Sequence, residues 1–365
     1  MFNTSINLLK MIEKAGFEAY IVGGFARDKY LKRDSYDVDV CTSATPKDLK
    51  QIFKTVVLPK EKYGSVSIIY KKIRFDITTF RKDIKYENNR RPIEIQYISN
   101  LKEDLLRRDF TMNTLCINSK GEFIDLLGAR NDIDKHIITA VGDANTKIVE
   151  DSLRILRAIR FATILDFDLD DKLRDAIKNN GYLLENLSFY RKKEELEKIF
   201  GSINAKKGIN LLIDLGLDRY LGVSNLKDVK PTTCALGVWA QLNPSSSYKF
   251  SKNELDIINL IKKFKDKKTF TARELYDNGL YVPLIVAEIN NIDHNFLART
   301  YMNLPIKNIS QIDINGKEIC TLLKINPSIK LKGIFKDIED KIINGTLPNN
   351  KKDIKSYILK NYSNE

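Results

Sequence analysis

The hydrophobic pattern divides the chain into two kinds of sequence. Up to about residue 125, apolar residues at helical spacing alternate with short runs that follow the two-residue period of a strand. From about residue 143 onward only helical spacing recurs, in segments separated by Gly, Pro and Asn. The pattern therefore predicts an α+β head followed by an all-helical remainder.

Within the head, the pattern predicts one sheet with helices packed against it. An amphipathic helix stops at Gly16, and a short apolar strand ends at the paired glycines Gly23 and Gly24. The predicted helices are 6–15, 25–31 and 46–53, and the predicted strands are 19–22, 37–40, 66–70 and 73–80, the last two forming a hairpin. In the helical part, the first long helix is predicted over 151–165 and a break over 242–251.

Composition and charge narrow the class of protein. A chain of 365 residues, 43% hydrophobic and 30% charged, is too long for one ordinary core and is expected to form two or three packing units. Its 61 Lys and Arg against 48 Asp and Glu give a net charge of +13, which favours a polyanion such as nucleic acid as partner. A general compositional bias towards lysine would produce the same excess.

The sparse cysteines and histidines exclude several chemistries. The four cysteines are scattered without a CxxC pair, and only His136 and His294 are present, so neither a disulfide framework nor a zinc site is indicated. No signal peptide and no run of about 18 apolar residues is found, so we expect a cytoplasmic protein without a membrane segment. Any catalysis must then rest on carboxylates.

The first candidate carboxylates are Asp37 and Asp39. Two residues apart on a predicted strand, they point to one face while Val38 and Val40 point to the other. Mg²⁺ is typically held by one or two carboxylates together with substrate phosphates, and this spacing permits that arrangement. Asp76, on the face of its strand opposite Phe75, would add a third carboxylate. Alternatively, these acids are solvated surface residues.

Residues 21–28, upstream of this pair, are predicted to form a strand, a Gly-Gly turn and the start of a helix. This arrangement would expose the backbone N–H groups near Gly24 to a triphosphate, and Arg27 would lie within reach of it. Two further motifs follow, Arg107-Arg108-Asp109-Phe110-Thr111-Met112-Asn113 and Glu150-Asp151-Ser152-Leu153-Arg154. In the second motif, the spacing of three places Asp151 and Arg154 on one helix face, and Arg157 and Arg160 continue the stripe. Each motif could instead be a capped helix start.

Together these motifs resemble the DNA polymerase-β-like nucleotidyltransferases, and most closely the class II tRNA CCA-adding enzymes and the similar bacterial poly(A) polymerases. The RRDxxxN and EDxxR elements carry the narrower match. The resemblance implies a head with a small mixed sheet, followed by an all-α neck, body and tail. The corresponding predicted domains are 1–140, 141–202, 203–295 and 296–365.

The resemblance also implies a role for each motif. Asp37 and Asp39 would bind Mg²⁺, and Asp76 remains a further catalytic candidate on the same face. Gly24, Arg27 and Arg108 would seat the triphosphate, and Asp109 and Asn113 would contact the ribose. Asp151 and Arg154 would select the base, because cytosine and adenine share an exocyclic amino group beside a ring acceptor. Arg157 and Arg160 would line the same pocket. Segments 79–83 and 90–92 would belong to a flexible loop that adjusts the pocket.

The implied reaction is template-independent addition of CCA to the 3′ end of tRNA from CTP and ATP, by two-metal in-line transfer with release of pyrophosphate. The implied partner is tRNA, held at its acceptor arm and elbow, with no DNA and no membrane. Three alternatives remain open: a poly(A) polymerase, a partial enzyme that adds only CC or only A, and a catalytically silent RNA-binding protein on the same scaffold.

Overall fold

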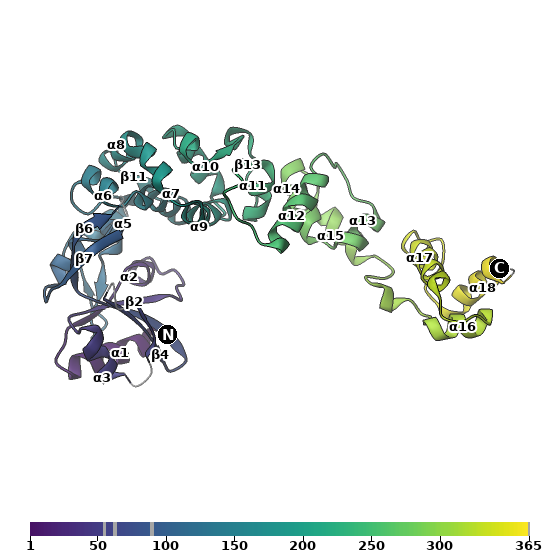
Figure 1. Ribbon diagram of the computed structural model, residues 1–365, viewed down its shortest axis with the longest axis horizontal. Helices are drawn as coiled ribbons and strands as arrows, with labels where there is room; N and C mark the ends of the chain where they lie inside the picture. Colours follow the sequence, from purple (N-terminus) through teal and green to yellow (C-terminus); the bar gives the residue numbers. More distant parts are fainter. Residues whose placement is uncertain (54–55, 61–63, 88–90, 364–365) are drawn as a thin grey trace. The chain divides into compact units, whose positions relative to one another are not determined.

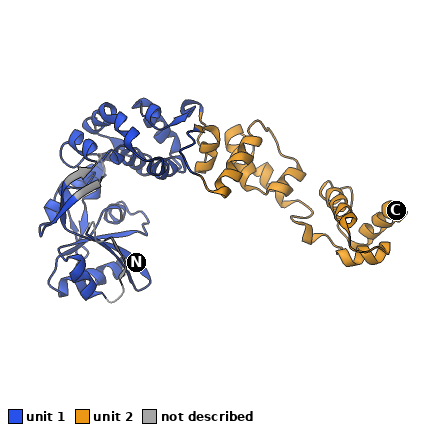
Figure 2. Ribbon diagram, viewed as in Figure 1, with its two compact units in different colours: residues 1–228, 244–249 blue, residues 229–243, 250–365 orange. Residues whose placement is uncertain are grey.

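The computed structural model describes residues 1–53, 56–60, 64–87 and 91–363 (Figure 1). Within these ranges the chain forms two compact units, residues 1–228 with 244–249, and residues 229–243 with 250–365 (Figure 2). The first unit contains the sheet and all the candidate site residues. The predicted α+β head and helical remainder are confirmed, whereas the four-domain division stays a prediction.

The head is built on a mixed seven-stranded sheet with the order β3-β4-β5-β2-β1-β8-β9. Only β2 and β5 pair in parallel among the described ladders of this sheet, and the predicted hairpin over 66–80 is formed by β4 and β5. The strands are β1 (Ala19–Val22), β2 (Val38–Thr42), β3 (Val56–Lys60), β4 (Ser65–Tyr70), β5 (Ile73–Thr79), β8 (Cys116–Ile117) and β9 (Phe123–Ile124).

Helices pack against this sheet as the hydrophobic pattern requires. Helix α1 contacts β1 and α3, and α2 contacts β1 and β2 (Figure 1). Helix α3 begins with a capping box in which Thr45 and Asp48 bond reciprocally to each other's backbone N–H. The head helices are α1 (Phe2–Lys14), α2 (Gly24–Tyr30), α3 (Pro46–Ile52), α4 (Leu101–Leu106), the 3₁₀ turn η2 (Thr111–Asn113) and α5 (Ala129–Asp134).

Two local expectations need correction. Strand β2 begins at Val38, so Asp37 lies immediately before the strand rather than on it. The segment expected to be a flexible loop contains two paired strands, β6 (Arg81–Glu87) and β7 (Arg91–Tyr97). Its charged residues hide the apolar alternation by which strands are recognised. Arg90, expected in the same loop, lies outside the described residues.

The remainder of the first unit is helical. Helices α6 and α8 contact each other, and α7 contacts both α9 and α10. Helix α7 begins at Leu153, two residues later than predicted. The elements are β10 (Ile137–Ile138), α6 (Ala144–Glu150), α7 (Leu153–Leu165), β11 (Asp168–Leu169), α8 (Asp171–Asn180), η3 (Gly181–Asn186), α9 (Phe189–Phe200), α10 (Ala205–Asp214), η4 (Asp218–Tyr220), β12 (Val223–Ser224) and η5 (Leu226–Asp228).

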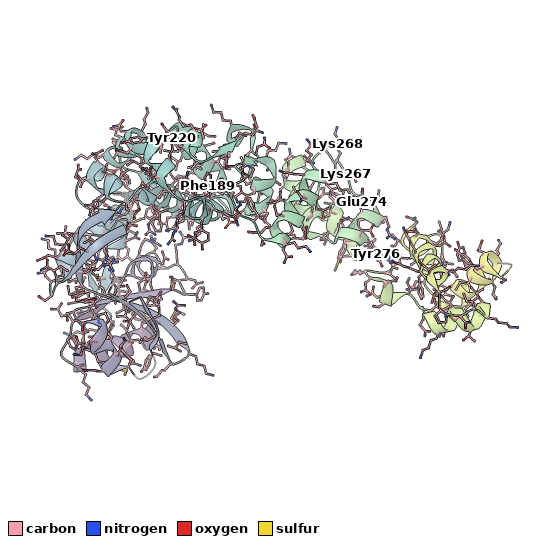
Figure 3. The ribbon with its side chains drawn as sticks, viewed as in Figure 1. Phe189, Tyr220, Lys267, Lys268, Glu274 and Tyr276 are labelled. Carbon is pink, nitrogen blue, oxygen red and sulfur yellow. The ribbon has the colours of Figure 1, made fainter. Side chains whose placement is uncertain are left out.

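Residues 244–249 return to the first unit and are fixed there by buried contacts. The Tyr248 hydroxyl donates to the carbonyl of Leu221 at 2.6 Å, and the Tyr248 ring meets Phe189 edge-on at 4.8 Å. Lys192 lies over the ring of Phe189 and donates to the carbonyl of Tyr220 (Figure 3). The predicted break over 242–251 therefore coincides with the point where the chain passes between units.

The second unit is helical, and one of its cores is rich in isoleucine. Ile319, Ile338, Ile342, Ile354 and Ile358 are buried in it. Glu339 of α17 accepts hydrogen bonds from Arg273 at 3.0 Å and Tyr276 at 2.5 Å, both on α13 (Figure 3). The elements are α11 (Ala235–Gln241), β13 (Asn243–Pro244), α12 (Lys252–Lys263), α13 (Ala272–Asn278), α14 (Tyr281–Asn290), α15 (His294–Met302), η6 (Ile309–Gln311), α16 (Gly316–Leu323), α17 (Ile329–Ile343) and α18 (Lys351–Tyr362).

Within the described ranges, no helix has the length and apolar character needed to span a bilayer. All four cysteines are free thiols, with Cys41 and Cys116 fully buried.

Candidate active site

Two carboxylates lie side by side on one face of the head sheet, and a third closely precedes one of them in the sequence. Asp39 of β2 lies directly opposite Asp76 of the parallel strand β5, and Asp37 precedes Asp39 by two residues. Val38 and Val40 are buried on the other face, so the carboxylates project away from the core. Asp76 is held by hydrogen bonds from Ser67 and Arg74. Asp39 and Asp76 thus lie side by side on neighbouring strands, whereas Asp37 is outside the strand.

The environment of Asp39 concentrates negative charge. Desolvation, together with the charges of Asp37 and Asp76, raises the pKa of Asp39 to about 6, while Arg108 and Arg157 oppose the rise. The side chain nevertheless remains accessible to solvent. A partly desolvated carboxylate between two others is a site that a bound cation would stabilise.

The paired glycines approach this carboxylate closely. Gly23 has a φ of 77°, which favours glycine, and a Cβ there would lie 3.4 Å from Oδ2 of Asp39. Val22, the residue before it, is the ladder partner of Asp39. Helix α2 then starts at Gly24 and carries Arg27. The turn therefore sets both the position of the carboxylate and the start of the helix.

A continuous hydrogen-bonded chain connects α2 with α7. Arg27 Nη1 donates to Oδ1 of Asn113 at 2.7 Å, and Asn113 Nδ2 donates to Oδ1 of Asp109 at 3.1 Å. Arg157 donates to Oδ2 of Asp109 from Nε at 2.8 Å and from Nη2 at 2.5 Å. Burial alone would raise the pKa of Asp109, but Arg157 and Asn113 hold it well below its ordinary value. Asp109 and Asn113 thus orient two candidate arginines.

Phe161 lies among three guanidinium groups. The carbon atoms Cζ of Arg27, Arg157 and Arg160 lie 5.2, 5.4 and 4.3 Å from the centre of its ring. Arg160 is also paired with the buried Glu195. An aromatic face attracts cations at these distances, so the ring holds like charges together that would otherwise repel.

Arg154 and Asp151 are both present at the junction of α6 and α7, but they have separate partners. Arg154 Nη1 donates to Oε2 of Glu150 and to the carbonyl of Lys147, both at 2.8 Å. Asp151 lies before α7 and accepts from the backbone N–H of Leu153 at 3.1 Å. Burial raises the pKa of Asp151, while the nearby charge of Arg154 opposes the rise. Asp151 and Arg154 therefore lie at the junction of α6 and α7 and not on one face of a single helix, as was expected.

The two halves of the candidate site meet at Arg157. Its charge acts on Asp39, on Asp109 and on Asp151, so the acidic face of the sheet and the start of α7 belong to one region of the first unit. Among the residues that the structure describes, no group of three or more His, Cys, Asp or Glu side chains is arranged to hold a metal ion by itself. The hard oxygen donors of Asp37 and Asp39 nevertheless fit Mg²⁺ completed by substrate phosphate and water.

Sequence reasoning missed the residues that hold the arginines. Asp104 pairs with Arg108, Glu150 with Arg154, and Glu195 with Arg160. Two of these partners lie four residues before their arginine, a spacing that indicates a helical ion pair. The partner of Arg160 is 35 residues away. Phe161 had no predicted role either, and Gly23 was predicted only as part of the Gly-Gly turn.

Comparison with known proteins places this geometry in a class. Residues 19–139 match the model of the poly A polymerase head domain, residues 166–222 match that of the probable RNA- and SrmB-binding site of polymerase A, and residues 245–358 match that of the putative second domain of tRNA nucleotidyltransferase. The fold and these matches define a nucleotidyltransferase, a class of enzymes that generally uses a divalent metal ion.

Similarity over the full length specifies the family. The chain is 33% identical to the CCA-adding enzyme of Limosilactobacillus reuteri, covering 96% of this chain and 94% of that protein. It is 31% identical to that of Streptococcus uberis, covering 100% and 98%. The crystal structure of the Bacillus stearothermophilus CCA-adding enzyme in complex with CTP superimposes with a TM-score of 0.80 at 29% identity, covering 98% and 97%. The chain therefore belongs to the CCA-adding enzyme family of tRNA nucleotidyltransferases.

Proposed function

We propose that this chain completes or rebuilds the 3′ CCA end of tRNA with CTP and ATP, without a nucleic-acid template. The observation that carries the proposal is that the similarity to CCA-adding enzymes extends through the helical part as well as the head. A head alone would fit a poly(A) polymerase equally well, since the matching head family is named for that enzyme. The helical part is what favours tRNA as the partner.

Asp37 and Asp39 are assigned as ligands of Mg²⁺, with Asp76 as a third acid on the same face. Mg²⁺ prefers oxygen ligands and usually keeps several positions for water and phosphate. When bound, the metal would lower the pKa of the primer 3′-hydroxyl and neutralise charge on the triphosphate. In the reaction, the primer 3′-oxygen attacks the α-phosphorus, the bond to the leaving oxygen breaks, and pyrophosphate is released.

The triphosphate is assigned to Gly24, Arg27 and Arg108. The Nε atom of Arg108 is buried and has no hydrogen-bond partner within the described structure, as expected of a donor reserved for an anion. Asp109 and Asn113 would bind the ribose with the acceptor capacity that their bonds to Arg157 and Arg27 leave free.

The base is assigned to Asp151 and Arg154, with Arg157 and Arg160 lining the pocket. A carboxylate accepts from the exocyclic amino group of cytosine or adenine, and a guanidinium donates to the adjacent ring acceptor. Uracil and guanine present a carbonyl where the amino group should be. The bonds from Arg154 to Glu150 and Lys147 support this role, because they hold the guanidinium in a fixed orientation.

The tRNA acceptor arm and elbow are the assigned nucleic-acid contacts, and the cytoplasm is the assigned location. The net charge of +13 and the free cysteines support these assignments. The four predicted domains at 1–140, 141–202, 203–295 and 296–365 supply the corresponding parts: a catalytic head, a neck that reads the base, a body, and a tail that binds tRNA.

An incorporation assay separates this function from its alternatives. Purified protein is mixed with Mg²⁺ and tRNA lacking CCA, lacking CA, or lacking only the final A, and each labelled nucleotide is supplied alone and in combination. Addition of C, C and one A, followed by termination, is the expected result. Continued A addition indicates a poly(A) polymerase, exclusive C or A addition indicates a partial enzyme, and no incorporation indicates a silent RNA-binding protein.

Asp37→Ala is the matched variant for this assay. Loss of one metal-binding carboxylate should abolish incorporation while leaving tRNA affinity, measured by filter binding, close to that of the wild type. Wild-type turnover by Asp37→Ala would contradict the metal assignment without affecting the family assignment.

A further inference from the structure

Asp104 is a fully buried carboxylate that the proposed reaction leaves without a role. It lies in α4, three residues before Arg107 and four before Arg108, and its side chain is 0% exposed. A buried carboxylate is very costly unless it is paired and hydrogen-bonded, so its partners reveal what it holds in place.

The partners of Asp104 come from two directions. Oδ1 accepts from Nε of Arg107 at 2.9 Å and from the backbone N–H of Arg81, the first residue of β6, at 3.2 Å. Oδ2 accepts from Nη2 of Arg108 at 3.1 Å. Burial alone would raise the pKa of Asp104, but the two guanidinium groups keep it below its ordinary value, so the carboxylate is charged.

Arg108 is held by this contact on the acidic side of the sheet. Its charge acts on Asp39, which places the guanidinium in the region of the carboxylates that face the candidate metal site. Its Nε is buried and unpartnered, so one donor edge of the guanidinium is occupied by Asp104 while another donor remains for a ligand. A guanidinium fixed at one edge is pre-organised for an anion at another.

We propose that Asp104 is a positioning residue that orients Arg108 and thereby sets the affinity of the site for the triphosphate of the incoming nucleotide, without touching that nucleotide. The proposal rests on the assignment of Arg108 to the triphosphate under the proposed function. Because CTP and ATP share the triphosphate, Asp104 should influence both nucleotides equally and should not influence the choice between them.

The test compares Asp104→Asn, Asp104→Glu, Arg108→Ala and the double variant Asp104→Asn/Arg108→Ala. For each, kcat and KM are measured for CTP, ATP and tRNA, together with inhibition by pyrophosphate and the midpoint of thermal unfolding. Asp104→Asn is expected to raise KM for CTP and for ATP about tenfold, the order expected when a charge-assisted hydrogen bond is weakened. Inhibition by pyrophosphate should weaken by a similar factor, and KM for tRNA should not change.

The double variant carries the decisive comparison. If Asp104 acts through Arg108, Asp104→Asn should add little to the effect of Arg108→Ala, because the positioned group is already absent. Asp104→Glu keeps the charge and should raise KM less than Asp104→Asn. Glu103→Gln, which removes an exposed charge from the same helix, is the control and should match the wild type.

The proposal is overturned if the effects of the two substitutions simply add in the double variant. It is also overturned if Asp104→Asn lowers kcat and the unfolding midpoint while the KM values for CTP and ATP stay unchanged. If Asp104→Asn does not fold, Asp104→Glu decides, and unchanged KM values and pyrophosphate inhibition in that variant overturn the proposal. Failure of the proposed function is distinguishable, because the wild type itself would then not add C, C and one A to tRNA.

Discussion

Each arginine of the candidate site is held by a carboxylate or amide from elsewhere in the chain. This arrangement fixes guanidinium orientation before a nucleotide arrives, and it spares the reaction the entropy of ordering long side chains. It also keeps several buried cations close together without mutual repulsion. The pairs are Arg27 with Asn113, Arg108 with Asp104, Arg154 with Glu150, Arg157 with Asp109, and Arg160 with Glu195.

Arg154 provides a prediction at this scale. Arg154→Ala should relax the discrimination between CTP and UTP by about tenfold or more, because one bidentate contact to a base edge contributes on that order. Glu150→Gln should give a smaller relaxation, since it weakens the contact that orients Arg154. Incorporation of each nucleotide is measured on tRNA lacking CCA.

Arg191→Ala is the control for that experiment. It removes an arginine from a partly exposed pair with Glu194 on α9 and should leave nucleotide choice unchanged. Unaltered discrimination in Arg154→Ala would show that the base is selected by other residues.

Residue types and spacing are sufficient to predict which side chains are candidates for the site, but not what holds them. The two-residue spacing of Asp37 and Asp39 and the helical spacing of Arg154, Arg157 and Arg160 are local features of the sequence. Glu195 gains its role only through a tertiary contact, because an ion pair over 35 residues has no local sequence signal. Phe161 meets Arg157 and Arg160 on its own helix, and only its contact with Arg27 is tertiary.

Among the elements, α7 is tied to the head by several polar contacts. Arg157 pairs with Asp109, Arg154 donates to the carbonyl of Arg107, and Lys147 of α6 donates to the carbonyl of Leu106. The Asp109–Arg157 pair has 11% and 32% of its side chains exposed, so solvent screens it only in part. These contacts join α6 and α7, which carry residues proposed to select the base, to the end of α4 and the segment that follows it.

Because of the Asp109–Arg157 pair, we expect the stability of the folded chain to depend on pH. The pKa of Asp109 is lowered in the folded chain, so the unfolded chain takes up a proton first as pH falls below about 4. The stabilisation by Asp109 is therefore complete above that value and declines as pH drops towards the folded pKa. Asp109→Asn should cost about 3 kcal/mol at pH 7 and less at pH 3.

Urea unfolding at pH 7, 5, 4 and 3 measures this effect. The free energy of unfolding should fall less steeply with acidity in Asp109→Asn than in the wild type. Asp256→Asn, which removes an exposed charge on α12, should follow the wild-type curve. Parallel curves for wild type and Asp109→Asn would contradict the role of the pair.

The elements that were predicted correctly are those whose own sequence signals are strong. Strand β1 is apolar and ends at glycines, and α3 has a proline and a capping residue at its start. The hairpin of β6 and β7 was expected to be a loop, because its charged residues mask the strand period. Helix α7 begins two residues later than predicted, because the backbone of Asp151 is extended at the end of α6.

At the scale of the whole molecule, part of the positive charge behind the net charge of +13 is clustered in one segment of the second unit. Residues 262–268, at the end of α12 and in the segment after it, contain five lysines. Two of them, Lys267 and Lys268, are labelled in Figure 3. Lys267 is paired with Glu274, whereas Lys262, Lys263, Lys265 and Lys268 are exposed. Exposed lysines close together suit phosphate groups, which are contacted along an RNA backbone.

The salt dependence of tRNA affinity tests whether these four lysines meet the RNA. Replacing Lys262, Lys263, Lys265 and Lys268 by Gln should weaken binding, and the slope of log affinity against log salt should become shallower by about 0.7–0.9 for each phosphate that the variant no longer neutralises. Filter binding between 50 and 300 mM KCl, roughly the range over which such slopes are linear, gives the slope. The control replaces Lys10, Lys14, Lys47 and Lys50 on α1 and α3, which removes the same charge from the head. Direct binding of phosphate to the four lysines of 262–268 releases counterions there and not at the control lysines of α1 and α3. Equal slopes in both variants would therefore mean that the lysines act only through the net charge of the protein.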